Sequence, residues 1–145
     1  MKKAIAIAKV AGKSGEIPVG AIIIDSTNQI LAQSGNRKEK QQDPTAHAEV
    51  LAIRAASQMY QDWHLNDCTL YVTLEPCPMC AGAIIHARLK QVVYGVDDPK
   101  TGAFRSTANF ADAPFSNHRP NVIGGIAETD CRQLLQQWFM KSRKS

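Results

Sequence analysis

The chain has 145 residues, of which 44% are hydrophobic and 21% charged, which is typical of one globular domain with its own core. Its net charge of +4 is compatible with an anionic partner such as nucleic acid but does not by itself indicate one. The longest apolar run, residues 19–24, is far shorter than the ~18 residues of a membrane span. Four cysteines are too few for a secreted disulfide scaffold. We therefore expect no membrane segment and no disulfide framework.

We expect residues 1–145 to form a single domain, because no repeat and no long linker divides the chain. Residues 140–145 are a basic end that we expect to fray. The apolar run after Lys2 and Lys3 is interrupted by Lys9 and is too short for a signal peptide. A mature N-terminus and a cytoplasmic location are therefore expected, and an N-terminal extension of the first helix is the alternative.

Taken in chain order, the predicted elements are a helix (1–13), a hairpin of two strands (19–24 and 29–33), a polar loop (34–43), a helix (46–59), a strand (69–74), a helix (76–88), a strand (91–96), an irregular stretch (97–120), a short strand (121–124) and a last helix. The helices follow from apolar residues at helical spacing, and the strands from β-branched and apolar runs between turn residues. Thr45 is the expected N-cap of the second helix. Helices that alternate with buried strands predict the α/β class, with a largely parallel sheet covered by helices on both faces.

Two motifs stand at the starts of predicted helices. His47-Ala48-Glu49 opens one helix, and Pro76-Cys77-Pro78-Met79-Cys80 opens the next. Cys77 and Cys80 are three residues apart and share one face of a helix, so they can bind a single ion. Helix starts gather at one edge of a parallel sheet, which would bring His47 to the same ion.

Three nitrogen and sulfur ligands suit zinc, and a three-ligand site leaves a fourth position for water, as in catalytic zinc sites. Zinc lowers the pKa of such a water to about 7. Glu49 lies two residues after His47 and is placed to transfer protons. Each piece alone has an ordinary explanation: a surface histidine, a structural or redox Cys-x-x-Cys pair, or a solvated glutamate. The joint spacing makes a catalytic zinc site the better interpretation, and Cys68 and Cys131 are expected to be buried small side chains.

The same motifs resemble a known group of enzymes. Residues 44–49, residues 73–86 and residues 93–95 with 98–102 are similar to the cytidine deaminase-like superfamily of zinc deaminases, most closely to its bacterial tRNA-specific adenosine deaminases. The resemblance implies a three-layer α/β/α sandwich around a mixed five-stranded sheet. It also implies a homodimer, one zinc ion per subunit, and hydrolytic conversion of the wobble adenosine of a tRNA anticodon stem-loop to inosine.

The resemblance also assigns roles to residues. It makes His47, Cys77 and Cys80 the metal ligands and Glu49 the catalytic proton carrier. The remaining matches are substrate-binding positions: Asn36, the amide of Ala48, Asp98, Lys100 and Phe139. Phe104 and Arg105 depart from the smaller residues usual in relatives, so we expect them to reshape the substrate rim, and Arg105 is an alternative phosphate contact.

Other functions share parts of this pattern. A zinc deaminase of a free base or nucleotide, such as guanine or cytosine, would carry the same metal motif. A non-catalytic zinc-binding module would need a fourth protein ligand, for which the spare cysteines have no suitable spacing. A redox Cys-x-x-Cys protein would leave His47 and Glu49 without a role.

Overall fold

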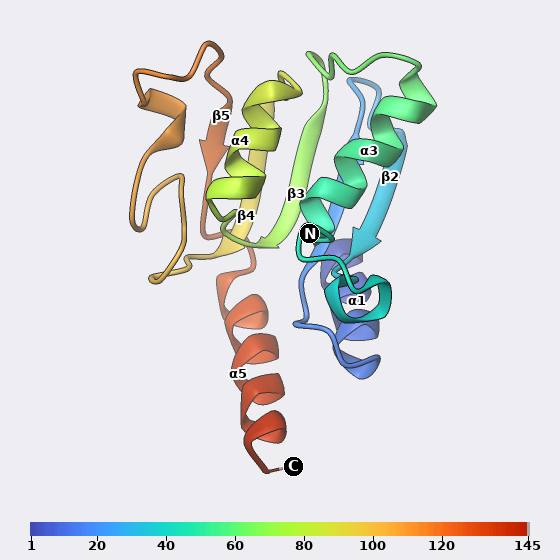
Figure 1. The fold of residues 1–145 in the computed structure, drawn as a ribbon, viewed down its shortest axis with the longest axis vertical. Helices are drawn as coiled ribbons and strands as arrows, with labels where there is room; N and C mark the ends of the chain where they lie inside the picture. The colour runs from blue at the N-terminus through green and yellow to red at the C-terminus, as the bar shows by residue number, and fades with distance from the viewer. Residues whose placement is uncertain (145) are drawn as a thin grey trace.

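The computed structural model describes residues 1–144 and centres on one five-stranded sheet of order β2-β1-β3-β4-β5 (Figure 1). The strands are β1 (Gly20–Ile24), β2 (Ile30–Gly35), β3 (Thr69–Leu74), β4 (Gln91–Val96) and β5 (Asn121–Ile123). β1 pairs antiparallel with β2 and with β3, whereas β4 pairs parallel with β3 and with β5. The mixed five-stranded sheet that the resemblance implied is thus confirmed. The largely parallel sheet expected from the element pattern is found only in β3, β4 and β5, because β1 runs antiparallel to both of its neighbours.

Helices cover both faces of this sheet and complete the α/β/α sandwich. α3 (Ala48–Tyr60) and α4 (Pro78–His86) lie side by side in front of the sheet in Figure 1, and α1 (Lys2–Lys13) lies behind it. α1 approaches β1 closely, because a Cβ atom on Gly20 would lie 2.1 Å from the Ala4 carbonyl oxygen. The core between these layers is built from buried aliphatic side chains such as Ile23, Leu70 and Ile84.

The last helix, α5 (Glu128–Lys144), begins against β4 and ends beyond the sheet (Figure 1). Cys131 is buried where the helix meets Gly95 of β4, and Trp138 donates a hydrogen bond to the Gly12 carbonyl at 3.0 Å. Helical backbone extends through residues 140–144 of the expected basic tail, and Ser145 lies outside the described residues. Among the helices of residues 1–144, none combines the length and apolar composition that a bilayer crossing requires.

Two helix starts differ from the sequence-based boundaries, and both position the site. α3 begins at Ala48 with His47 as its N-cap, not Thr45, because the Thr45 hydroxyl donates instead to Asp43 at 2.8 Å. α4 begins at Pro78 with Cys77 as its N-cap, and proline suits this first helical position because it has no amide hydrogen to satisfy. A short helix, α2 (Lys38–Gln41), lies in the segment expected to be a loop, and a 3-10 turn, η1 (Phe110–Asp112), lies in the irregular stretch.

Candidate active site

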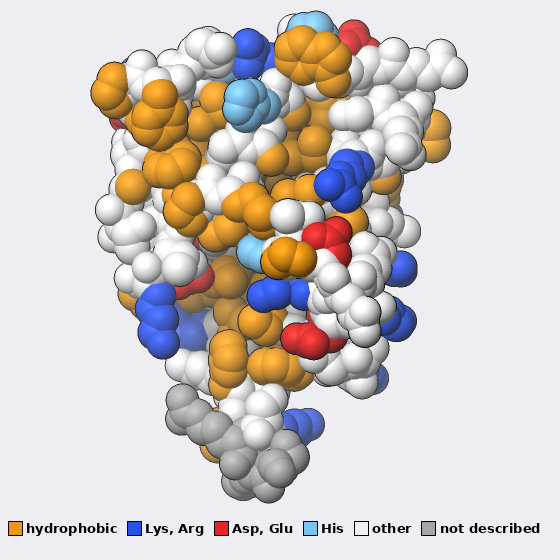
Figure 2. Space-filling view, viewed as in Figure 1, with side chains coloured by type: hydrophobic (Ala, Val, Ile, Leu, Met, Phe, Trp, Pro, Cys, Tyr) orange, Lys and Arg blue, Asp and Glu red, His pale blue; other side chains and the backbone are white. Residues whose placement is uncertain are grey.

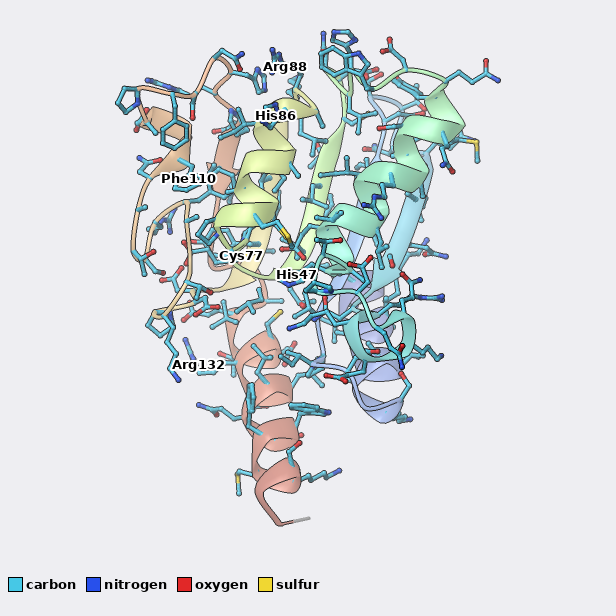
Figure 3. All side chains as sticks on the ribbon, in the orientation of Figure 1. His47, Cys77, His86, Arg88, Phe110 and Arg132 are labelled. Carbon is cyan, nitrogen blue, oxygen red and sulfur yellow. The ribbon has the colours of Figure 1, made fainter. Side chains whose placement is uncertain are left out.

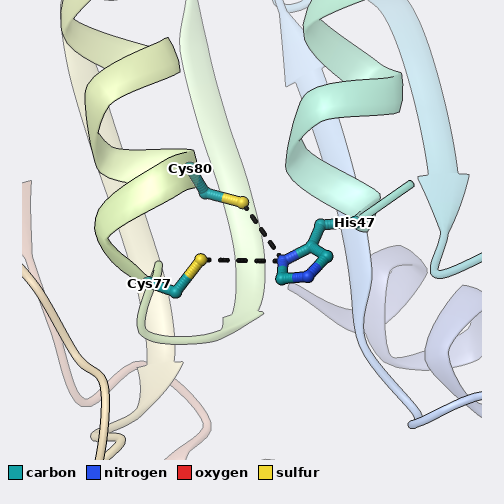
Figure 4. A group of neighbouring side chains, drawn as sticks. All are labelled: His47, Cys77 and Cys80. Atoms are coloured by element: carbon teal, nitrogen blue, oxygen red, sulfur yellow. Dashed lines mark hydrogen bonds between the residues drawn. The ribbon is translucent and has the colours of Figure 1, made fainter. Parts of the chain in front are cut away.

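The structure brings the three sequence-predicted ligands together at the starts of α3 and α4. Nδ1 of His47 lies 3.6 Å from the Cys77 sulfur and 3.5 Å from the Cys80 sulfur (Figure 4). Two ligand atoms at ordinary zinc–sulfur and zinc–nitrogen distances, placed tetrahedrally, lie about 3.6 Å apart. All three ligand atoms fall within 4.8 Å of one another. The three side chains therefore fit a single zinc ion, and among residues 1–144 they form the only such group.

The three ligands differ in how readily they lose a proton: the pKa of Cys77 is lowered, whereas the hydrogen bond with Cys77 raises the pKa of Cys80. A hydrogen bond from Cys80 lowers the pKa of Cys77 to about 4, so its thiolate, the form that binds metals, is present at neutral pH. The hydrogen bond with Cys77 also raises the pKa of His47. An imidazole must lose its proton from the ligating nitrogen to bind a metal, so metal binding and protonation compete at this residue.

Glu49 is buried beside the cluster, with 4% of its surface exposed. Burial raises its pKa to about 7, which is near the value best suited to proton transfer at neutral pH. The surrounding cavity has a volume of about 160 Å³ and is lined by Glu49, His47 and Cys77 together with side chains of several loops. Pockets for drug-sized ligands have roughly 300–1,000 Å³, so this one suits a single base.

Asn36 borders the cavity and is held by two hydrogen bonds. Its Oδ1 accepts the Ala48 amide at 2.8 Å, and its Nδ2 donates to the Ile17 carbonyl at 3.2 Å. An amide side chain offers two acceptor and two donor positions, so one of each remains for a ligand. The Ala48 amide donates to Asn36 and Ala48 is fully buried, so its expected donation to a substrate requires this hydrogen bond to be shared or replaced.

The other expected substrate contacts are spread over the rim. Asp98 lines the cavity, and its carboxylate accepts the amides of Lys100 and Thr101 at 3.0 and 3.2 Å. Lys100 is exposed but does not line the cavity. Phe139 is 43% exposed on α5, against Trp138, and also lies outside the cavity lining.

The two unusual rim residues point in opposite directions. Phe104 is buried in the core with 4% of its surface exposed, so the expectation that it reshapes the rim was wrong, because this side chain fills the space under the loop instead. Arg105 is exposed, and its guanidinium lies 5.7 Å from the centre of the Tyr94 ring. Only Arg105 of the pair is available to a substrate.

Three polar residues of the cavity wall received no individual role in the sequence analysis: Lys38, Thr101 and Glu75. Lys38 lies on a segment with no periodic pattern, so no sequence signal marks it, whereas Thr101 falls within the motif at residues 98–102. Glu75 stands directly before the Pro-Cys-x-x-Cys motif, and a charged residue between an apolar strand and a metal motif was the available signal. Figure 3 shows His47 and Cys77 at the same edge of the sheet, far from His86 and Arg88.

Comparison with known proteins places this site in a family. Residues 1–143 match the sequence family described as MafB19-like deaminase, and the chain belongs to this deaminase family. It is 44% identical over 144 residues to the tRNA-specific adenosine deaminase of Haemophilus influenzae, which covers 99% of this chain and 83% of the relative. The chain is accordingly a member of the tRNA-specific adenosine deaminases.

Solved structures agree with this assignment. One, described in a study of A-to-I editing by tRNA:A34 deaminases at the wobble position of transfer RNA, superposes with a TM-score of 0.90 at 41% identity and covers 93% of this chain and 97% of its own. The guanine deaminase of Bacillus subtilis superposes with a TM-score of 0.65 at 35% identity, over 95% and 90% of the two chains. The fold is thus shared by deaminases of different substrates.

Proposed function

We propose that this protein hydrolyses adenosine to inosine at the wobble position of a tRNA anticodon. The observation that carries the proposal is the cavity that holds three convergent metal ligands and the buried carboxyl group of Glu49. The names of its relatives supply the substrate class.

We infer that His47, Cys77 and Cys80 hold one zinc ion per chain, because their donor set and spacing fit zinc. When bound, zinc makes water a nucleophile at neutral pH by lowering its pKa. The three ligands sit on the first turns of two core helices, which fixes their relative positions before any metal arrives.

In this proposal, Glu49 moves the protons of the reaction. It accepts a proton from the attacking water and donates it to N1 of adenine, while the water oxygen forms a bond to C6. Glu49 then transfers the second proton to the amino group, and the C6–N6 bond breaks to release ammonia. Adenosine and water are thereby converted to inosine and ammonia. The near-neutral pKa of Glu49 allows it both to accept and to donate at physiological pH.

The cavity receives the base alone, so the base must leave its stack before it reacts. A single-stranded anticodon loop presents such a base at small unstacking cost. We infer that Asn36 binds the base or ribose through its remaining donor and acceptor positions. Asp98 and Thr101 also line the cavity, and we infer that they limit how the base enters.

RNA phosphates would meet basic side chains around the cavity. Lys38 lines it, and Lys40, Lys100 and Arg105 are exposed on the adjoining segments. In Figure 2, a histidine lies in the middle of this face, where Figure 3 labels His47, with lysine or arginine side chains directly below it. We infer that these side chains and Phe139 contact the anticodon stem-loop, through phosphates and base stacking respectively.

We also infer a homodimer in the cytoplasm. The exposed Met79, directly before Cys80 on α4, supports a subunit contact near the site, and light scattering in solution would measure the oligomeric state. All four cysteines are free thiols in the structure, which suits a reducing compartment such as the cytoplasm. The proposed tRNA substrate is also present in the cytoplasm.

One experiment tests the main proposal. Unmodified tRNA with adenosine at the wobble position, free guanine and cytidine are incubated in parallel with the zinc-loaded protein, and inosine and ammonia are measured. We expect inosine in the tRNA and no deamination of the free compounds. Ammonia from guanine without inosine in tRNA would instead support the second candidate, a free-base deaminase, which the likeness to guanine deaminase makes the natural alternative.

A further inference from the structure

Glu75 is a buried carboxylate that neither binds the metal cluster nor faces it with a free oxygen. It stands between the end of β3 and Cys77, and 1% of its surface is exposed. Burying a carboxylate costs several kcal/mol unless hydrogen bonds replace its water. The structure supplies such bonds from a single loop, residues 98–106.

Both oxygens of Glu75 are filled by this loop. Oε1 accepts the Asp98 amide at 3.0 Å and the Ser106 hydroxyl. Oε2 accepts three successive amides, those of Phe104, Arg105 and Ser106, at 3.2, 2.8 and 3.0 Å. With these partners Glu75 has no acceptor position left for a substrate, so a direct role in the chemistry is excluded.

The loop fits closely around the carboxylate. A Cβ atom on Gly102 would lie 2.2 Å from Oε1 of Glu75, so only glycine leaves room here. The loop thus surrounds the Glu75 carboxylate with five hydrogen-bond donors.

The same loop forms one wall of the cavity. Asp98 and Thr101 line it, and the exposed Lys100 and Arg105 lie on the same loop. No helix or strand occurs within residues 98–106, so regular backbone hydrogen bonding does not fix the wall. Apart from Glu75, the loop is tied to the metal-binding turn by the Ala103 amide, which donates to the Pro76 carbonyl at 2.9 Å.

We propose that Glu75 is a positioning residue that fastens the substrate-facing loop 98–106 to the metal-binding turn and so sets the distance between the bound base and the metal cluster. The inference rests on the proposed function for the identity of the substrate. In physical terms, one carboxylate two residues before Cys77 accepts five hydrogen bonds from the loop that lines the cavity and so holds that loop in place.

The variant Glu75→Gln tests this directly. Glutamine keeps the shape but replaces one oxygen by an NH₂ group, which then opposes either the Asp98 amide or the three amides of residues 104–106. We expect amide hydrogen exchange at Asp98 and Arg105 to accelerate about tenfold or more, since a hydrogen bond to a charged group is lost or weakened. Exchange in β3 and zinc content should match the wild type.

Kinetics separate positioning from a general loss of structure. With an anticodon stem-loop as substrate, we expect the KM of Glu75→Gln to rise about tenfold while kcat changes by about twofold at most, the pattern of lost substrate binding. Ser106→Ala, which keeps the carboxylate and removes one donor, should shift exchange and KM in the same direction by less. If Glu75→Gln does not fold, the exchange rates and the KM of Ser106→Ala test whether Glu75 positions the loop.

Asp25→Asn is the matched control. Asp25 also organises a turn, accepting the amides of Thr27 and Gln29 at 2.8 and 3.0 Å. That turn lies at the other end of the sheet, because Ile24 pairs with Thr69 at the start of β3. We expect faster exchange only at its own turn and an unchanged KM.

Two results would overturn the inference. One is exchange in loop 98–106 that stays at the wild-type rate in Glu75→Gln and Ser106→Ala. The other is a fall in kcat together with loss of zinc, which would show that Glu75 acts on the metal turn and not on the loop. If the wild-type protein produces no inosine from the stem-loop, the proposed function fails, yet the exchange rates still decide whether Glu75 holds the loop.

Discussion

The two sides of the cavity are built by different means. The reactive side consists of His47, Glu49, Cys77 and Cys80 on the first turns of α3 and α4, whose following residues are packed in the core. The proposed substrate side includes loop 98–106, which contains no helix or strand and donates hydrogen bonds to the buried Glu75 carboxylate. The groups that need fixed distances are thus placed on helix starts, whereas the loop is held by the Glu75 carboxylate, by the Ala103–Pro76 hydrogen bond and by the buried Phe104.

Removing a metal ligand should have the largest effect, because it breaks the reactive side itself. In Cys80→Ser we expect zinc to be lost and deamination to fall by about 10³-fold or more, since the nucleophile is no longer activated. Metal content by atomic absorption and inosine formation check this. Cys68→Ala is the control: Cys68 is buried away from the cluster and its loss should leave zinc in place. Full zinc content in Cys80→Ser would contradict the ligand assignment.

Replacing Glu49 should leave the reactive side assembled but without its proton carrier. We expect Glu49→Gln to keep one zinc per chain and to lower kcat by about 10²- to 10⁴-fold, the usual contribution of a general acid–base group. The assay is single-turnover inosine formation in the zinc-loaded variant. A kcat within a few-fold of the wild type would show that another group moves the protons.

Crowding the substrate side should give a smaller and different effect. In Gly102→Ala the new methyl group collides with the Glu75 carboxylate, and we expect a loss of about 1–3 kcal/mol in the free energy of unfolding and a raised KM with zinc retained. Gly82→Ala on α4 is the matched control, because nothing lies within 4 Å of its Cβ position. A helical alanine there should stabilise the protein by about 0.5–1 kcal/mol. Equal stability of the two variants would argue against close packing around Glu75.

The smallest effect on activity at neutral pH is expected outside both sides of the cavity, at the contact of α5 with β4, where the change is in stability at alkaline pH. Burial raises the pKa of Cys131 to about 11, whereas an unfolded thiol ionises near pH 8.5. The folded state therefore holds its proton while the unfolded state loses it, so stability is full below pH 8.5 and declines as pH rises toward 11. Urea unfolding at several pH values should show a slope that is shallower in Cys131→Ala, by up to about 1.4 kcal/mol per pH unit. Parallel slopes would contradict the burial of this thiol.

Much of the fold follows from local patterns. The β-branched run at residues 69–74 and the apolar run at 91–96 coincide with β3 and β4, because strands that are buried on both faces need uninterrupted apolar sequence. Helix starts were less predictable. Thr45 is a residue type that commonly caps helices, but its hydroxyl donates a hydrogen bond to Asp43 instead. Which of two neighbouring polar groups pairs with a hydroxyl depends on the local backbone conformation, which the sequence does not show.

For the site, the spacing of His47, Cys77 and Cys80 was sufficient to predict that the three side chains converge at one place that could hold a metal ion. The substrate side was not predictable in the same way. Phe104 was expected at the rim of the cavity but is buried. The Ala48 amide was expected to face a substrate but donates a hydrogen bond to Asn36. Both outcomes depend on how the loops around the cavity fold, which decides which side chains are buried and which amides are already hydrogen-bonded.

The sequence by itself determined the strands, the order of the helices and the four reactive residues, because periodicity and ligand chemistry are local properties of the chain. The tertiary structure alone decided the burial of Phe104 and the partners of Glu75. Those features arise from pairing between segments some 30 residues apart, such as Glu75 with Arg105 and Ser106. Such pairing depends on which hydrogen-bond donors and acceptors are buried next to one another in the folded chain. It therefore cannot be predicted from the sequence of one segment alone.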